Sequence, residues 1–275
     1  MTLTDMQRRL AAAGIEDAAW EARLLAAHYT GLSDARLLLM GREELEAPGL
    51  EAAVARRETR EPLQYILGEW SFMGLSFSVN SHCLIPRPDT ETLVEYAIRH
   101  LPKNARAADL CTGSGCIGIA LAHYRPDVTV TAVDLFPETA KMAEENARRL
   151  GVSDRFTVQV GDVTEEIFSP DERFAAIVSN PPYITLEEMK DLAPELSYEP
   201  RAALTDEGDG LSVIRGVLAA ASRHLEDDGL LLMEFGAAQG EAVSRLAREY
   251  SFYDVHILKD AAGRDRVLCA RRGAF

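Results

Sequence analysis

Four consecutive residues, Asn180-Pro181-Pro182-Tyr183, combine groups that suit the recognition of a planar NH2. The Asn180 side chain offers a carbonyl, and Pro181 offers a backbone carbonyl on a residue without an N–H, so together they can accept both hydrogens of that group. The ring of Tyr183 gives a flat face on which an amide or a base can stack. A planar NH2 is a poor nucleophile because its lone pair is delocalised, and two fixed acceptors stabilise the positive charge that grows on its nitrogen during attack. These residues therefore predict electrophilic group transfer onto an amide or an exocyclic amine.

The run 174–179 that precedes this motif is short and almost wholly apolar, which predicts a strand buried on both faces of a parallel sheet. Two successive prolines cannot continue a strand ladder, so the strand ends where the motif begins. An Asn-Pro pair is also common as a simple turn at the end of a strand. Because all four residues follow a buried strand, at the edge where open α/β sheets bind ligands, we favour a functional site.

A second candidate site is the glycine-rich segment 109–118, which lies between a predicted strand and a predicted helix. Gly113 and Gly115 let the backbone approach a ligand closely, and their N–H groups face outward at the start of a helix. Gly118 completes a G-x-G-x-x-G pattern. Asp134 ends the next predicted strand, 21 residues after Gly113, where a carboxylate can accept hydrogen bonds from a ribose diol.

Nicotinamide dehydrogenases share this arrangement, but two features favour a sulfonium nucleoside. Asp109 adds a carboxylate expected at the mouth of the loop, which repels a pyrophosphate and tolerates a cationic amino acid. Asn-Pro-Pro-Tyr has no evident task in hydride transfer. Asp162 and Val163 follow the third predicted strand and can hold an adenine, Asp162 by accepting from its N6 amine and Val163 by packing on its ring. For Asp162, an acidic turn residue after Gly161 is the alternative.

From residue 107 onward, predicted strands and helices alternate, which is the signature of βαβ units in an α/β fold. The strand candidates are 107–110, 128–133, 156–160, 174–179, 230–235, 253–259 and 266–271, and the helix candidates are 116–124, 138–150, 212–225 and 240–250. Because only six residues, 260–265, separate the last two strands, this pair suits an antiparallel hairpin. We assign residues 86–275 to this domain.

Residues 1–67 predict a small bundle of short helices that either docks a partner or serves only structural packing. Apolar residues recur there at helical spacing, at Leu3, Met6 and Leu10, at Leu24, Leu25, His28 and Tyr29, and at Leu37 and Leu38. Residues 68–85 alternate with period two around Phe77 and predict a β-hairpin linker. Pro86-Arg-Pro-Asp-Thr-Glu91 follows, with Asp89 or Thr90 expected to cap a helix that runs to about Leu101. A rigid turn beside a cleft is the alternative reading of that stretch.

The chain has 275 residues, 47% of them hydrophobic and 27% charged, as in an ordinary soluble globular protein. Its net charge of −15 predicts weak nonspecific affinity for nucleic acid. The four cysteines, Cys83, Cys111, Cys116 and Cys269, form no C-x-x-C pair, and no zinc spacing is present, so we expect no metal. No signal peptide or apolar run of about 18 residues is present, so we expect a cytoplasmic protein without membrane partners.

Taken together, the seven-strand layout, the Asp109-Leu-Cys-Thr-Gly-Ser-Gly115 loop, Asp134 and Asn-Pro-Pro-Tyr resemble class I S-adenosylmethionine-dependent methyltransferases. More narrowly, the chain is similar to the bacterial release-factor glutamine N5-methyltransferases. This resemblance covers essentially the whole chain and rests on Pro86-Arg-Pro-Asp-Thr-Glu91, Asn180-Pro-Pro-Tyr183, Tyr198-Glu-Pro-Arg-Ala-Ala-Leu204 and Asp209-Gly-Leu211. It implies a seven-stranded, mostly parallel Rossmann-like sheet with one antiparallel strand, plus a small N-terminal helical bundle that helps to grip the substrate.

The resemblance also implies a substrate, a cofactor and site residues. The methyl acceptor is the glutamine of the Gly-Gly-Gln tip of peptide chain release factors, and S-adenosylmethionine is converted to S-adenosylhomocysteine. Asn180 and Pro181 bind the acceptor amide, while Pro182 and Tyr183 shape its pocket. The expected cofactor-binding residues are Cys111, Thr112, Gly113, Ser114, Gly115, Asp134, Asp162, Val163 and Asn180.

Other functions remain open on the sequence. Cys111 stands at a position where the release-factor family more commonly has glycine. A cysteine there also occurs in the sister family that methylates a glutamine of ribosomal protein uL3. N6-adenine methylation of DNA would use the same planar NH2, but it requires a flipped base and a basic track, which the net charge disfavours. A dehydrogenase is the third candidate function. A noncatalytic binding module is the least favoured, because both halves of a transfer site are present.

Overall fold

The computed structural model describes residues 1–41 and 43–273, which form two compact units. Unit 1 contains Met1–Glu69 together with the short segment Ala193–Tyr198. Unit 2 contains the rest of the described chain. The chain therefore leaves unit 2 after residue 192, contributes six residues to unit 1, and returns at residue 199.

Unit 1 is helical, as predicted for residues 1–67. Its helices are α1 (Leu3–Ala12), α2 (Ala18–Thr30), α3 (Asp34–Met40), α4 (Leu50–Glu58) and α5 (Leu63–Leu67), and the segment 193–198 adds the 3-10 turn η2 (Pro194–Tyr198). The predicted buried stripe of Leu3, Met6 and Leu10 is confirmed. In α2 the predicted face is partly wrong, because Ala22 and Leu25 are buried while His28 is exposed. Small alanines allow α2 to pack closely in this core, so periodicity of large residues did not identify its inner face.

Residues 68–85, expected as a hairpin linker, contain the strands β1 (Glu69–Phe72) and β2 (Leu75–Ser78). Phe72 and Phe77 are fully buried in the core of unit 2 and contact each other edge to face. Asn146 accepts from the Ser78 N–H and donates to its carbonyl, at 2.8 and 3.0 Å. Most of this segment is therefore packed into unit 2.

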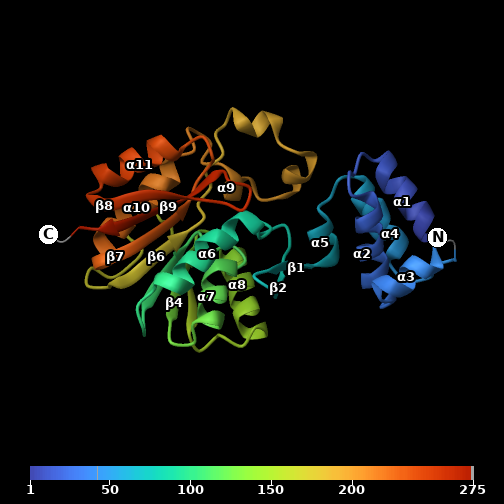
Figure 1. Cartoon of the computed structure of the whole chain (residues 1–275), viewed down its shortest axis with the longest axis horizontal. Coiled ribbons are helices and arrows are strands. Elements are labelled where there is room, and N and C mark those ends of the chain that lie inside the picture. The colour runs from blue at the N-terminus through green and yellow to red at the C-terminus, as the bar shows by residue number, and fades with distance from the viewer. Residues whose placement is uncertain (42, 274–275) are drawn as a thin grey trace. The chain divides into compact units, whose positions relative to one another are not determined.

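Unit 2 is built on a seven-stranded sheet in the order β5-β4-β3-β6-β7-β9-β8 (Figure 1). Its strands are β3 (Arg106–Leu110), β4 (Thr129–Asp134), β5 (Phe156–Val160), β6 (Phe174–Ser179), β7 (Leu225–Glu234), β8 (Phe252–Lys259) and β9 (Asp265–Arg272). Only β9 runs antiparallel to its neighbours β7 and β8. The predicted fold class, including its single antiparallel strand, is confirmed.

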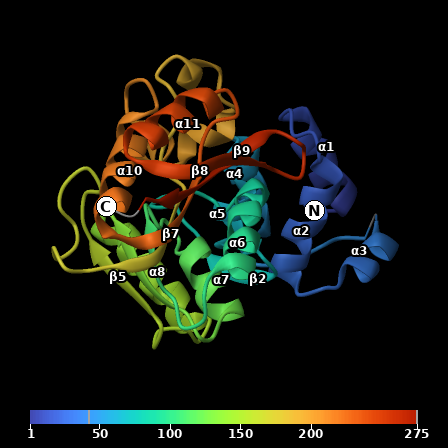
Figure 2. The same ribbon diagram turned by 60° about the vertical axis from the view of Figure 1, so that its left-hand side comes forward.

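Helices cover both faces of this sheet, because alternate residues of its buried strands point to opposite faces. One face packs against α6 (Pro88–His100), α7 (Cys116–Tyr124) and α8 (Pro137–Arg149). The other face packs against α10 (Ser212–His224) and α11 (Gly240–Glu249), which lie together in Figure 2. The remaining short elements are η1 (Glu188–Asp191) and α9 (Arg201–Leu204).

The start of α6 corrects one prediction. Arg87 is the N-cap and Pro88 is the first helical residue, whose fixed φ and missing N–H suit that position. Neither Asp89 nor Thr90 caps the helix. Asp89 forms an ion pair with Arg264 at 2.7 Å, and the hydroxyl of Thr90 is directed to a buried carboxylate described below.

Candidate active site

The centre of the site is set by the pairing of β3 with β6, where the strand order reverses direction. Leu110 and Ser179, the last residues of these strands, pair in parallel register, and the Ser179 hydroxyl donates to the Leu110 carbonyl at 2.7 Å. Cys111 and Asn180 therefore leave the sheet side by side at its carboxyl edge. Such a switch point is where open α/β sheets bind ligands.

The glycine loop after β3 needs two of its glycines for steric reasons. Gly115 is the N-cap of α7 with φ +83°, and a Cβ there would lie 2.6 Å from Cδ1 of Ile119. At Gly118 a Cβ would lie 2.9 Å from Oδ2 of Asp109. The loop and helix can therefore sit close to β3 only with glycine at these positions.

Asp109 does not lie at the mouth of the loop, where the sequence placed it. It is fully buried beneath the loop, and its Oδ2 accepts from the Thr112 hydroxyl at 2.6 Å and from the Gly118 N–H at 2.9 Å. Its Oδ1 has no hydrogen-bond partner among the described residues. Burial raises the pKa of Asp109 to about 7.

The raised pKa of Asp109 predicts a pH-dependent stability. Between about pH 4 and pH 7 the folded state binds a proton that the unfolded chain releases, so the free energy of unfolding falls as pH rises through this range. Asp109→Asn removes this proton-linked contribution to stability. The free energy of unfolding of the variant, relative to that of the wild type, is therefore expected to rise by about 1–3 kcal/mol between pH 5 and pH 8. Urea unfolding at both pH values measures this difference.

Asp127 offers a matched control for that measurement. Hydrogen bonds from Arg125 hold its pKa below its usual range, so it is ionised in the folded protein at both pH values. Asp127→Asn should therefore shift stability equally at pH 5 and pH 8. A shift in Asp109→Asn that is also independent of pH would contradict a titrating Asp109.

Asp134 ends β4 beside the glycine loop. Its Oδ2 accepts from the Gly113 N–H at 2.9 Å and its Oδ1 accepts from the Phe136 N–H at 3.1 Å. Burial raises the pKa of Asp134, although these N–H donors act in the opposite direction. A carboxylate has about four acceptor positions, so Asp134 can still accept two hydroxyl donors of a ribose.

If the cleft binds S-adenosylmethionine, as the resemblance implies, Asp134→Ala is expected to weaken that binding by about 1–3 kcal/mol, because two ribose hydroxyls would lose their acceptor. Isothermal titration calorimetry measures the change. Asp162→Ala is the comparison variant, and its effect should be smaller because a single adenine amine, rather than two ribose hydroxyls, would lose its acceptor. Wild-type affinity in Asp134→Ala would remove this residue from the site.

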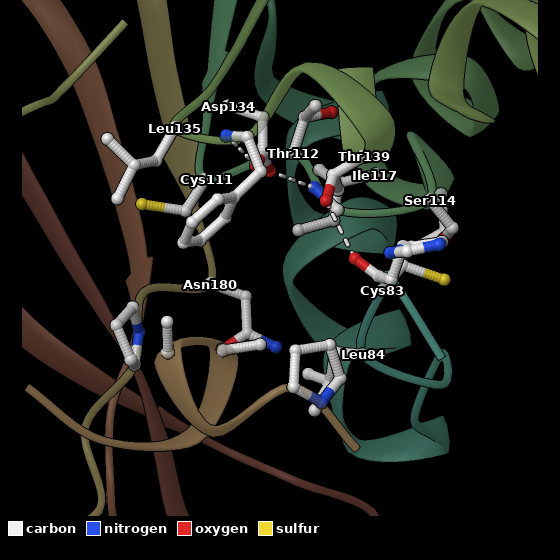
Figure 3. Close-up of a pocket in the computed structure, with 18 of the residues that line it drawn as sticks. Cys83, Leu84, Cys111, Thr112, Ser114, Ile117, Asp134, Leu135, Thr139 and Asn180 are labelled. Atoms are coloured by element: carbon white, nitrogen blue, oxygen red, sulfur yellow. Dashed lines mark hydrogen bonds between the residues drawn. The ribbon is translucent and has the colours of Figure 1, made fainter. Parts of the chain in front are cut away.

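A cleft of about 970 Å³, including its open mouth, brings most of the predicted residues together. Of those residues, Cys111, Thr112, Gly113, Ser114, Asp134, Asp162, Val163, Asn180 and Pro182 line it. In Figure 3, Asp134 and Leu135 lie along one side of the cleft and Asn180 lies on the opposite side. Gly115, Pro181 and Tyr183 do not line this cleft. Gly115 determines the conformation of the glycine loop, and Pro181 and Tyr183 lie in the segment that follows Asn180.

Cys111 occupies the cleft in an unusual conformation. Its φ is +59°, a region that glycine adopts freely and other residues adopt at a free-energy penalty. Burial raises the pKa of its thiol, so the reactive thiolate is scarce. The thiol therefore contributes packing surface to the cleft rather than a nucleophile.

The Asn-Pro-Pro-Tyr segment is held by buried polar contacts. The Asn180 amide nitrogen donates to the Thr90 hydroxyl at 3.3 Å, and the Tyr183 hydroxyl donates to Oε1 of Glu234 at 3.1 Å. Pro181 is buried, and no described donor hydrogen-bonds its carbonyl. Burial raises the pKa of Glu234 above its usual range, although Thr90 and Tyr183 act in the opposite direction.

Gly210, in the Asp-Gly-Leu stretch, packs directly on this segment. Its φ is +72°, and a Cβ there would lie 2.2 Å from the carbonyl oxygen of Tyr183. The same carbonyl accepts from the Gln239 side chain at 2.9 Å. Two distant parts of the chain therefore fix the backbone that follows Asn180.

The remaining lining residues were not among the predicted site residues, although the stretch 86–91 had a rigid turn beside a cleft as its alternative interpretation. They are His82, Cys83, Leu84, Pro86, Arg87, Thr90, Cys116, Ile117, Leu135, Phe136, Thr139, Gly161, Pro200, Ala202, Ala203 and Val213. Leu135 and Phe136 are about half exposed directly after Asp134, so two large apolar residues between a strand-ending acid and Pro137 were a usable signal. Pro200, Ala202 and Ala203 belong to the stretch 198–204 that carried the family resemblance, but only the tertiary fold brings them to the cleft.

Two kinds of feature are absent from the part of the chain that the structure describes. None of the helices there combines the length and apolar character needed to cross a membrane. No cluster of three or more histidine, cysteine, aspartate or glutamate side chains is arranged there to hold a metal ion.

The chain is similar to known proteins over nearly its whole length. Residues 2–68 match the family described as PrmC N-terminal domain, and residues 89–235 match the methyltransferase small domain. A release factor glutamine methyltransferase of Cereibacter sphaeroides is 43% identical over 267 residues, which are 96% of this chain and 94% of that protein. One of Geobacter sulfurreducens is 41% identical over 96% of this chain and 93% of that protein. A methyltransferase structure from Pyrococcus furiosus, with a TM-score of 0.55 and 17% identity over 74% of this chain and 92% of that one, shares the fold.

Proposed function

Because the chain belongs to the release factor glutamine methyltransferase family, we propose that it transfers a methyl group from S-adenosylmethionine to the side-chain amide nitrogen of a glutamine in peptide chain release factors. The acceptor is the glutamine of a Gly-Gly-Gln motif. The observation that carries this proposal is Asn180, which lines the cleft beside the glycine loop and directs its amide nitrogen away to Thr90. Its carbonyl oxygen is thereby left to accept from an NH2 group.

The cleft suits the cofactor by the chemistry of its lining. Asp134 retains acceptor positions for two ribose hydroxyls, and Val163 offers buried apolar surface to an adenine. A Cβ at Gly113 would meet no described atom within 4 Å, so open space lies over the backbone there. When bound, this group supplies an electrophilic methyl on a sulfonium.

In this proposal the protein acts mainly by positioning. Asn180 and the Pro181 carbonyl accept the two hydrogens of the glutamine amide and stabilise the positive charge that develops on its nitrogen. The nitrogen gains the methyl group and loses one hydrogen as a proton to water or a nearby acceptor. No strong general base is required, because the N-methylated cation is acidic.

We further propose that unit 1 docks the protein substrate. Its match to the PrmC N-terminal domain supports this role. Large apolar side chains are exposed on α2 and α3, at Trp20, Leu38 and Leu39, with Leu39 81% exposed. Leu38 and Leu39 are adjacent on α3, and exposed apolar side chains that cluster in this way favour protein contacts.

A methyl-transfer assay with labelled cofactor tests the function. Purified release factor, ribosomal protein uL3 and duplex DNA are offered separately, and the labelled product is mapped. Label on the Gly-Gly-Gln glutamine supports the proposal, label on uL3 changes the partner, and label on DNA alone overturns it. A short Gly-Gly-Gln peptide methylated as well as the intact factor would argue against docking by unit 1.

A further inference from the structure

A buried carboxylate lies behind Asn180. Glu234 ends β7 and is 1% exposed, and Thr90, in the first turn of α6, is 2% exposed. The Thr90 hydroxyl lies 2.6 Å from Oε2 of Glu234, while its oxygen is also 3.3 Å from the Asn180 amide nitrogen. On the other side, Oε1 of Glu234 lies 3.1 Å from the Tyr183 hydroxyl.

The directions of these hydrogen bonds can be assigned from both ends. Arg266 lies 3.4 Å from the Tyr183 oxygen and can only donate, so Tyr183 directs its single proton to Glu234. The 2.6 Å contact from Thr90 has the length of a hydroxyl bound to a carboxylate, so the proton of Thr90 also goes to Glu234. Every bond then converges on Glu234, which accepts as a carboxylate. Burial raises the pKa of Glu234, but the two hydroxyl donors and the charge of Arg266 favour its ionised form.

This arrangement leaves Thr90 one role toward Asn180. Because its proton is used by Glu234, the Thr90 oxygen can only accept, so the Asn180 NH2 must face it. A flipped amide would place two oxygens with no proton between them, which is unfavourable. The unflipped amide keeps Oδ1 away from Thr90, on a side chain that points into the cleft (Figure 3).

We propose that Glu234 is a positioning residue that, through the Thr90 hydroxyl, fixes the Asn180 amide with its oxygen available to the substrate. The inference rests on the proposed function, since the polarity of Asn180 matters only if the acceptor is an NH2 group. Glu234 itself lies behind the residues that contact the substrate. Its effect should therefore appear in turnover and leave cofactor affinity unchanged.

The test compares Thr90→Val, which keeps the shape and removes the hydroxyl, with Thr90→Ser, which restores the hydroxyl. Single-turnover methylation of release factor, calorimetry with S-adenosylmethionine and thermal unfolding are measured on each full-length variant. Thr90→Val is expected to lower the rate about 10- to 100-fold, a usual range for residues that orient an active-site ligand. Thr90→Ser is expected to recover most of that loss. Unchanged cofactor affinity is expected for a substitution at Glu234, which does not line the cleft.

Two results would overturn the inference: equal rates in wild type and Thr90→Val, or equal impairment in Thr90→Val and Thr90→Ser. If Thr90→Val fails to fold, Glu234→Gln provides the decision. Its side-chain NH2 can accept from neither hydroxyl, so only one of the two hydroxyls, Thr90 or Tyr183, keeps its acceptor. The rate should therefore fall, and a wild-type rate would contradict the assignment. Absence of methylation by the wild-type protein itself would instead count against the proposed function.

Discussion

Asn180→Ala is expected to lower the methylation rate by at least about 10³-fold, equivalent to roughly 4 kcal/mol of transition-state stabilisation. The substitution removes the side-chain acceptor that strengthens its interaction as charge grows on the amide nitrogen. The cofactor cleft keeps Asp134 and the glycine loop, so cofactor affinity should change by much less. Labelled-methyl transfer under single-turnover conditions measures the rate, and calorimetry measures the affinity.

Ser179→Ala is the matched control for that loss. Ser179 is the neighbouring residue, is fully buried, and its hydroxyl donates to the Leu110 carbonyl at 2.7 Å. Its removal should reduce stability by about 1 kcal/mol, because one buried hydrogen bond is lost, and leave methylation near the wild-type rate. Full activity in Asn180→Ala, or an equal loss in both variants, would contradict the assignment of the acceptor amide to Asn180.

Arg57→Met is expected to destabilise unit 1 by about 3–5 kcal/mol, because it leaves two carboxylates without their buried cation. Arg57 is 5% exposed and forms paired hydrogen bonds with Glu21 at 2.6 and 3.1 Å. It also contacts Glu195 in the returning segment at 3.0 Å. Burial of Glu195 opposes its ionisation, but hydrogen bonds from Arg60 and Arg57 hold its pKa below the usual range. Amide hydrogen exchange in unit 1 should become at least about 100-fold faster.

Arg56→Met is the control for this experiment. Arg56 forms a similar paired contact with Glu61, but its side chain is 46% exposed, so its loss should change stability by less than about 1 kcal/mol. The double variant Arg57→Met with Glu21→Leu should recover part of the stability, because one unpaired carboxylate is removed. Equal effects of Arg56→Met and Arg57→Met would mean that the buried contacts add nothing.

The predicted strands of unit 2 agree with the structure to within one residue at most ends. The exception is β7, which begins at Leu225 although the prediction began at residue 230. Its first residues were missed because 226–228 are charged, and they are exposed in the structure. Apolar runs, glycines and prolines act through local dihedral preferences and side-chain period, so nearby residues specify these boundaries. The order of the strands in the sheet was not predicted and comes from the structure.

Local sequence patterns did not predict the contacts between residues that are distant in the chain. Thr90 has the type of a helix cap, yet it binds Glu234, 144 residues away, because α6 packs against β7. Asp109 precedes a glycine loop and looked accessible, yet the loop folds over it. Nothing near residues 193–198 indicated that they belong to unit 1.

The sequence by itself determined which segments become strands and helices, and it placed the glycine loop, Asp134 and Asn-Pro-Pro-Tyr at strand ends. Each of these follows from a pattern within about ten residues. The tertiary structure alone decided which way the Asn180 amide faces, how deeply Asp109 is buried and where the segment 193–198 packs. Those properties depend on hydrogen bonds and burial between residues brought together only when the sheet and its helices assemble.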